Sequence, residues 1–180
     1  KVEAIRYLHL DNIKHNNSSL DLEYKKSNLL VIGDYVPEMT HHVLTMLNHL
    51  DKSRISNFNI CFKAHPATPI SLSQYNNLII HETKKPIVKM LPDVDIVLST
   101  VNTSASIEFF LAGIPVIVVI HDNNFISSPL RGQLGVDFVT TPEQLVRTLN
   151  NIKQVLQKPR GKNFFWMDPK LPRWKKLLKL

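Results

Sequence analysis

Short apolar segments alternate with amphipathic ones along the middle of the chain. Runs rich in β-branched residues predict strands at 28–32, 59–64, 78–81, 95–98, 116–120 and 136–139. Between them, apolar positions three or four residues apart predict helices at 37–50, 87–91, 105–112 and 142–156. The alternation predicts an α/β protein, a Rossmann-like three-layer sandwich around a mostly parallel, doubly wound sheet of about six strands.

The segment 95–120 organises this pattern, because it reads as strand, polar turn, helix and strand. Residues 99–104 are mostly small hydroxyl and amide residues, and Gly113 suits the end of the helix that follows them. Ligands bind at the carboxyl ends of strands in open α/β sheets, and this turn falls at such an end. A helix N-terminus also favours an anion, so we expect an anion-binding site here.

Three parts follow one another along the chain. Residues 1–26 read as an N-terminal helix and a polar linker, 27–158 as the Rossmann-like domain, and 159–180 as an aromatic and basic tail. The tail combines tryptophan and leucine with lysine, so it predicts peripheral contact with an anionic membrane. The alternative is docking on the domain's own surface or on a neighbouring domain, which the shortness of its apolar face favours.

Composition narrows the choice of partners. The 180-residue chain is 43% hydrophobic, carries a formal net charge of +7, and contains a single cysteine, Cys61. The positive charge predicts an anionic partner. Nucleic acid is not expected, because the basic residues gather in the tail and no nucleic-acid-binding motif is present. A lone cysteine cannot form an internal disulfide and favours a reducing compartment. No apolar run approaches the roughly 20 residues of a membrane span.

A lysine and a histidine end the second predicted strand. Lys63 and His65 lie two residues apart, so alternation puts them on the same face, and Pro66 follows. Together they could neutralise a diphosphate at the carboxyl edge of the sheet. The alternative is equally favoured by spacing alone: Lys63 is a solvated edge residue and His65 caps a turn.

Further candidates lie in the turn of the central unit. The hydroxyl residues suited to binding phosphate are Ser99, Thr100, Thr103 and Ser104. Ordinary N-capping by Asn102, Thr103 or Ser104 is the alternative. Glu108 lies four residues after Ser104, one too many for a capping box, so it is either a ribose ligand or a surface glutamate.

Two loops add candidates. Gly33 and Asp34 follow the first strand, where glycine lets backbone approach a ligand. Arg131 is the cation of a long loop at 121–135, and a solvated arginine is the alternative. Neither a GxGxxG nor a GxxxxGK[ST] motif occurs. The pairs His41-His42 and His121-Asp122 lack metal-ligand spacing, so we predict no metal site.

Taken together, these residues resemble the C-terminal half of a GT-B glycosyltransferase over about residues 26–180. Lys63-Ala64-His65-Pro66 looks like the K-x-H-P element of capsule polymerases, glycerophosphotransferases and bacterial sialyltransferases. Ser99-Thr100 and Thr103-Ser104 look like the hydroxyl pair that binds phosphate in those enzymes, and Glu108 resembles their ribose-binding glutamate. The segments 129–132 and 168–174 are similar to recurring pieces of a bacterial surface carbohydrate biosynthesis family.

The resemblance implies the donor-binding domain of a glycosyltransferase for surface polysaccharide, acting in the cytoplasm or at the inner face of the membrane. It implies that a nucleotide-sugar binds without metal or other cofactor, with His65, Lys63 and Arg131 stabilising the leaving phosphate. An acceptor domain would precede this chain, which would be inactive alone, and no residue is nominated as general base. A second enzyme interpretation is a nucleotide-sugar 2-epimerase, with Asp34, Glu82 or Asp122 as catalytic carboxylates. A third is a non-enzymatic flavodoxin-like interaction module.

Overall fold

The computed structural model describes residues 7, 26–121, 127–151, 165 and 168–179. Within them, one six-stranded sheet has the order β3-β2-β1-β4-β5-β6, and every pairing is parallel. The strands are β1 Ser27–Ile32, β2 Phe58–Lys63, β3 Ile80–Glu82, β4 Ile96–Thr100, β5 Val116–Val119 and β6 Val136–Val139. This order and direction confirm the predicted α/β, Rossmann-like class.

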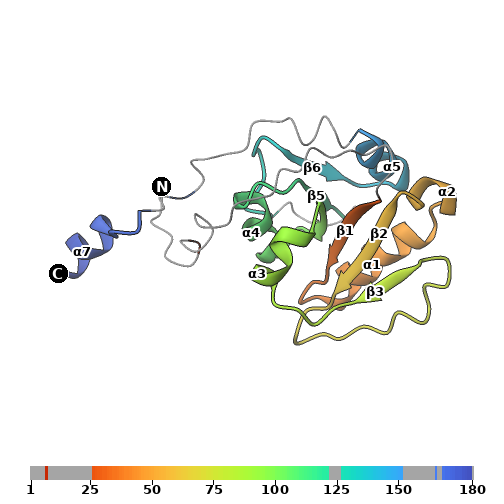
Figure 1. Cartoon of the computed structure of the whole chain (residues 1–180), viewed down its shortest axis with the longest axis horizontal. Coiled ribbons are helices and arrows are strands. Elements are labelled where there is room, and N and C mark those ends of the chain that lie inside the picture. Colours follow the sequence, from red (N-terminus) through yellow and green to blue (C-terminus); the bar gives the residue numbers. More distant parts are fainter. Residues whose placement is uncertain (1–6, 8–25, 122–126, 152–164, 166–167, 180) are drawn as a thin grey trace.

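Helices cover both faces of the sheet (Figure 1). They are α1 Pro37–Asn48, the single turn α2 Lys52–Ile55, α3 Ile87–Met90, a 3-10 turn Leu91–Asp93, α4 Ala105–Leu111, α5 Pro142–Asn150 and the tail helix α7 Pro172–Leu178. Side chains from α1 and α5 pack on one face, and side chains from α3 and α4 pack on the other. The result is the expected three layers.

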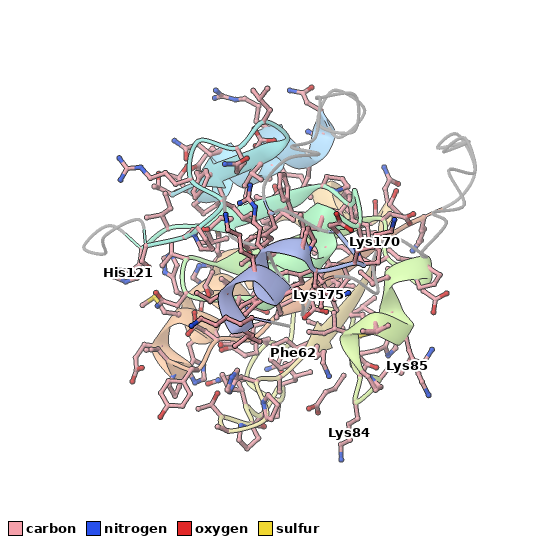
Figure 2. All side chains as sticks on the ribbon, turned by 90° about the vertical axis from the view of Figure 1, so that its left-hand side faces the viewer. Phe62, Lys84, Lys85, His121, Lys170 and Lys175 are labelled. Atoms are coloured by element: carbon pink, nitrogen blue, oxygen red, sulfur yellow. The ribbon has the colours of Figure 1, made fainter. Side chains whose placement is uncertain are left out.

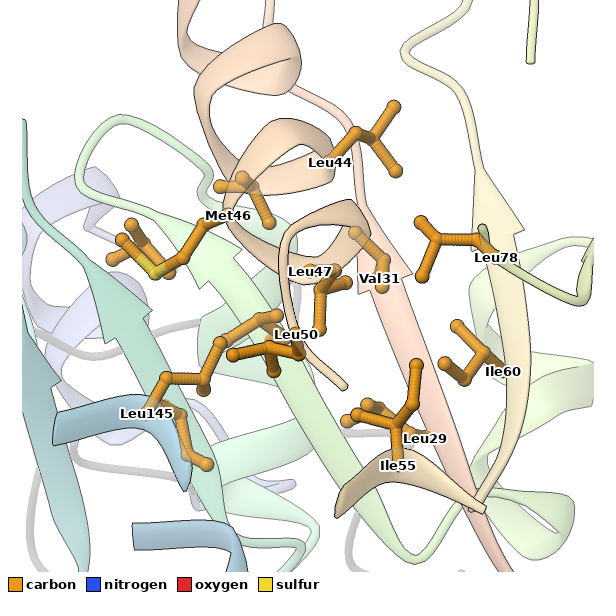
Figure 3. Close-up of a cluster of buried hydrophobic side chains, with 14 of the residues drawn as sticks. Leu29, Val31, Leu44, Met46, Leu47, Leu50, Ile55, Ile60, Leu78 and Leu145 are labelled. Atoms are coloured by element: carbon orange, nitrogen blue, oxygen red, sulfur yellow. The ribbon is translucent and has the colours of Figure 1, made fainter. Parts of the chain in front are cut away.

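Alternation along the strands divides the core into two clusters. Leu29 and Val31 of β1 belong to the α1 side, whereas Leu30 and Ile32 belong to the α4 side. Figure 3 shows the first cluster, in which Leu44 and Leu47 of α1 lie over the sheet. Both faces of the central strands are therefore buried, which explains their continuous apolar sequences.

Two strand boundaries differ from the sequence predictions by two residues, and the others agree to within one residue. β4 continues through Ser99 and Thr100, which pair with Val118 and Val119 of β5, so these residues belong to the strand and not to the turn. Small hydroxyl residues suggest a turn, but here pairing with the neighbouring strand decides their conformation. β3 begins at Ile80 and not at residue 78. The turn of α2 was not predicted, because one polar turn shows no periodicity.

The helix ends follow their predicted chemistry. Pro37 opens α1, and Glu38 lies in its first turn. The Thr141 hydroxyl accepts a hydrogen bond from the backbone N of Gln144 (3.3 Å), so Thr141 caps α5 as expected. Gly113 ends the α4 region with a φ of 87°, a conformation that favours glycine. The predicted continuation of α5 over 152–156 lies outside the described residues.

Two residues from the flanking parts join the core. Tyr7 stacks on Phe165 with ring centroids 5.1 Å apart, and both pack in the cluster on the α4 side. Tyr7 is only 7% exposed. The remaining residues of the predicted N-terminal helix and linker, 1–6 and 8–25, lie outside the described residues. The division of the chain at 26 and 158 remains a prediction.

None of the helices described is both long and apolar enough to cross a membrane.

Candidate functional site

The sheet reverses its winding between β1 and β4. These strands are neighbours at the centre of the sheet, but α1, which follows β1, and α4, which follows β4, pack on opposite faces. The loops 33–36 and 101–104 therefore diverge from one another at the carboxyl edge. Ligands of open α/β sheets bind in the crevice at such a switch point.

Asp34 lies at the centre of this point and is buried. Its carboxylate accepts hydrogen bonds from the Thr100 hydroxyl and, through Oδ1, from the backbone N of Val36 (2.9 Å). Its backbone N donates to the Thr40 hydroxyl (2.8 Å), and its carbonyl accepts from the Thr68 hydroxyl (2.8 Å). Asp34 thus joins the loop after β1, the turn after β2 and the last residue of β4.

The predicted phosphate-binding hydroxyls do not all face the same way. Thr100 contacts Asp34, and its hydroxyl lies 2.9 Å from that of Thr103. Both residues are buried, as is Ser99, whose Oγ has no hydrogen-bond partner among the described residues. Ser104 is exposed, and its side chain makes no capping hydrogen bond to α4. Of the four hydroxyl residues, Ser104 is therefore the one on the surface.

Helix α4 begins at this exposed serine. The Ser106 hydroxyl donates to the Thr103 carbonyl (2.6 Å), which fixes the turn that leads into the helix. Backbone N–H groups in the first turn of a helix have no partner within the helix, so this end attracts negative charge. Glu108 lies one turn further along and is 5% exposed, which excludes the alternative of a surface glutamate.

The turn after β2 packs directly against the end of β1. The backbone N of Gly33 donates to the Lys63 carbonyl (2.8 Å). A Cβ added to Gly33 would lie 2.9 Å from the backbone N of His65 and 3.3 Å from the Ala64 Cα. Glycine was expected to let a ligand approach here, but in the structure it makes room for this neighbouring turn. His65 is thereby held beside Asp34.

The His65 ring has a defined orientation. Its Nδ1 accepts a hydrogen bond from the backbone N of Ala67 (3.2 Å), which assigns the proton of the neutral ring to Nε2. The ring is half-buried and contacts Tyr35 edge-on, with centroids 5.6 Å apart. Nε2 is therefore a hydrogen-bond donor held in place at the carboxyl edge. Pro66 is exposed on the same turn.

Lys63 and Cys61 alternate with Phe62 along β2, so they share the face of the strand that points toward α3. Burial raises the pKa of the Cys61 thiol, and the charges of Lys85 and Lys63 oppose part of that rise. The Lys63 charge therefore acts on Cys61, on this face of the sheet. Of the two residues predicted to act together, His65 has the better defined position at the crevice.

Arg131 lies on a loop that is attached to the β4–α4 turn. The Ser127 hydroxyl donates to the Asn102 side-chain carbonyl (2.8 Å), and Leu130 is fully buried in the α4-side cluster. Arg131 itself is exposed. The Ser127 contact therefore attaches the start of this segment to the β4–α4 turn, and Arg131 follows three residues after Ser128. Residues 122–126 of this loop, including Asp122, lie outside the described residues.

Two contributors were missed in the sequence. Tyr35 is 68% exposed although the loop beneath it is fixed by the hydrogen bonds of Asp34, so it presents a ring from a well-ordered position. Thr68 connects the β2 turn to Asp34. An aromatic residue directly after a Gly-Asp turn was a signal for Tyr35, whereas no local signal pointed to Thr68.

The histidine pairs do not form a metal centre in the described part of the chain, where no three His, Cys, Asp or Glu side chains are placed to hold an ion. His42 and His121 contact one another, with ring centroids 4.6 Å apart. Two hollows, of about 350 and 270 Å³, lie over β2 and β3 and are both lined by His81. Neither is lined by Asp34, His65 or Ser104, so the candidate site at the switch point lies outside these two hollows.

Comparison with known proteins supports the fold. No protein-family model and no curated sequence matches the chain. Solved structures do match, among them a protein from Listeria monocytogenes assigned as a UDP-N-acetylglucosamine 2-epimerase (TM-score 0.60, 15% identity, 93% of this chain and 49% of that one). A second is the wall teichoic acid polymerase TagF, soaked with CDPG (TM-score 0.53, 18% identity, 83% of this chain and 37% of that one). A third is the forosaminyltransferase SpnP (TM-score 0.51, 15% identity, 88% of this chain and 46% of that one).

The chain is thus a Rossmann-like α/β domain of the kind that GT-B glycosyltransferases and their structural relatives contain. It spans less than half the length of each of these three proteins. At such low identity the likeness defines the fold, and the function has to be argued from the site.

Proposed function

We propose that this domain binds the nucleotide-sugar donor of a glycosyltransferase that builds bacterial surface polysaccharide. The observation that carries the proposal is the arrangement at the switch point, where the turn with His65 and the N-terminal end of α4 follow β2 and β4, on either side of the end of β1 that carries Asp34. A phosphate there would meet hydrogen-bond donors. The nearby Asp34 carboxylate already accepts hydrogen bonds from Thr100 and Val36. The TagF likeness and the resemblance of the 63–66 element support the pathway.

The donor's phosphate would bind between Ser104, the first N–H groups of α4, His65 and Arg131. As the bond between sugar and phosphate breaks, negative charge grows on the leaving phosphate. Donors already held in position stabilise that charge, and loss of one typically costs about 3–4 kcal/mol of the transition-state stabilisation. Glu108 is assigned to the ribose and Lys63 to the diphosphate, as the resemblance implies. The acceptor and the general base would come from a separate domain.

The 2-epimerase interpretation is the second candidate, favoured by the likeness to the Listeria protein. It requires a carboxylate that can exchange a proton with the sugar. Both oxygens of the Asp34 carboxylate are engaged, by the Thr100 hydroxyl and the Val36 backbone N. Glu82 is exposed at the end of β3, and two strands, β2 and β1, separate β3 from β4. The third candidate carboxylate, Asp122, lies outside the described residues. Among the described candidates, the geometry favours donor binding over epimerisation.

Calorimetric titration with CMP, CDP, UDP and GDP, with and without magnesium, tests the proposal. We expect one nucleotide to bind without magnesium, and His65→Ala, Ser104→Ala and Glu108→Ala each to weaken it about tenfold or more. His49→Ala is the matched control, because His49 is exposed just after α1, at the other edge of the sheet. Binding of no nucleotide, or equal loss in the His49 variant, would contradict donor binding. Conversion of a UDP-sugar to its epimer without acceptor would favour the second candidate.

A further inference from the structure

The tail helix α7 separates apolar and cationic side chains onto two faces. Trp174, Leu177 and Leu178 are spaced three and four residues apart and share one face. The remaining face holds Arg173, Lys175 and Lys176, and Lys179 follows the helix. Residues 172–179 include no carboxylate. The helix therefore combines a compact apolar strip with concentrated positive charge.

The two leucines of this apolar strip are exposed, whereas Trp174 is half-buried. No residue of α7 is buried, and Leu177 and Leu178 are 71% and 58% exposed. Figure 1 shows α7 projecting from the α4 side of the molecule, at the far left. Docking of the tail on the domain's own surface or on a neighbouring domain stays the alternative prediction. The side chains of Leu177 and Leu178 are exposed and can contact a partner.

We propose that α7 docks on the surface of an anionic phospholipid membrane. Lysine is depleted at protein–protein interfaces, so three lysines in and beside a helix of seven residues disfavour a protein partner. Basic helices with tryptophan and leucine on one face lie in the boundary between head groups and acyl chains. Tryptophan in particular favours that boundary, because its ring is apolar and its N–H is polar.

The two faces contribute different kinds of affinity. Each lysine or arginine near an anionic surface strengthens binding about fivefold at ordinary ionic strength, and salt weakens this contribution. The leucines contribute through burial of apolar area, which salt does not screen. A helix with one short apolar strip should bind reversibly, so the membrane would hold the domain without anchoring it permanently.

Sedimentation of the 180-residue chain with vesicles tests the proposal. We expect binding to phosphatidylcholine mixed with phosphatidylglycerol, and much less to phosphatidylcholine alone. Lys175→Gln with Lys176→Gln should weaken binding about 25-fold. Leu177→Ser with Leu178→Ser should weaken vesicle binding about tenfold or more. The weak binding that remains should be sensitive to salt. Since α7 is unburied, none of these changes should alter the thermal unfolding of the domain.

The matched control is Lys84→Gln with Lys85→Gln, which removes the same charge from another exposed place. Figure 2 shows these two lysines at the lower right, apart from α7 at the centre. Their loss should change vesicle binding less than about threefold, because separated surface charges are screened. Equal loss in the control, or no binding to anionic vesicles at low salt, would overturn the proposal. So would a dimer in solution that the leucine substitutions dissociate, because the strip would then join two copies.

Discussion

The Thr100 hydroxyl donates a hydrogen bond to the Asp34 carboxylate, and both side chains are buried where the sheet reverses its winding. The pair joins the end of β4 to the loop after β1. Residues that sequence reasoning assigned to a ligand therefore make contacts within the protein. They shape the crevice in which His65 and Ser104 are placed.

Removal of this hydroxyl should destabilise the domain. In Thr100→Val a buried carboxylate oxygen loses its donor, so we expect the free energy of unfolding to fall by about 1–3 kcal/mol. Thr100→Ser keeps the hydroxyl, so its free energy of unfolding should fall less than that of the valine variant. Urea unfolding followed by circular dichroism measures the difference. Equal stability of the valine variant and the wild type would show that the hydrogen bond contributes nothing.

Substitution of Gly33 should affect both stability and nucleotide binding. A Cβ at this position meets backbone atoms of His65 and Ala64, which cannot move aside without shifting the turn. We expect Gly33→Ala to cost about 1–3 kcal/mol in unfolding free energy and to displace His65. Urea unfolding and nucleotide titration check the two effects.

Gly113→Ala provides the comparison for Gly33. It introduces backbone strain at a φ of 87° but lies at the far end of α4. It should therefore lower stability while nucleotide affinity is retained. If Gly33→Ala likewise kept full affinity, the placement of His65 would not depend on the glycine.

The start of α5 should lose stability in acid. A hydrogen bond from its own backbone N–H, and then one with Thr141, hold the pKa of Glu143 below its ordinary value of 4.5. Because the folded state favours the ionised carboxylate, its contribution is present above pH 4.5 and is lost as pH falls through the folded value. Urea midpoints at pH 7 and pH 3 should differ more for the wild type than for Glu143→Gln. An identical pH dependence in both proteins would contradict this.

Cys61 should react slowly with alkylating reagents. Burial raises the pKa of its thiol above 9.0, so at pH 8 iodoacetamide should modify the folded protein more slowly than the urea-unfolded protein. The neutral thiol stabilises the fold below pH 9, and this contribution is lost as pH rises through the folded pKa. Lys85→Gln removes a nearby charge and should slow the reaction about two- to threefold. Lys84→Gln is the matched control, and an equal effect there would exclude a specific role for Lys85.

The succession of elements was predictable because it depends on local patterns. Pro37 and Thr141 marked helix starts correctly, and the six strands came from apolar runs. The details that failed depend on contacts between distant residues. Ser99 and Thr100 look like turn residues but pair with β5. Nothing near Gly33 in the sequence indicates that its neighbour would be the backbone of His65.

The sequence predicted where the site lies in the fold, but it did not predict which side chains contact one another there. Strand ends that carry His65 and Ser104 pointed to one edge of the sheet, and the structure has both there. Which hydroxyls face solvent was not predictable, because Thr100 and Thr103 have the same chemistry as Ser104. Their burial follows from the position of Asp34, which only the folded sheet defines.

The stack of Tyr7 on Phe165 bears on how this protein should be produced. A version cut to start at Ser27 would retain every strand yet lose the Tyr7 ring, which stacks on Phe165 and belongs to the α4-side cluster. Such a truncation should be poorly soluble or prone to proteolysis. An affinity tag placed directly against either residue would have the same drawback. The smallest version worth purifying therefore includes Tyr7 and Phe165 together.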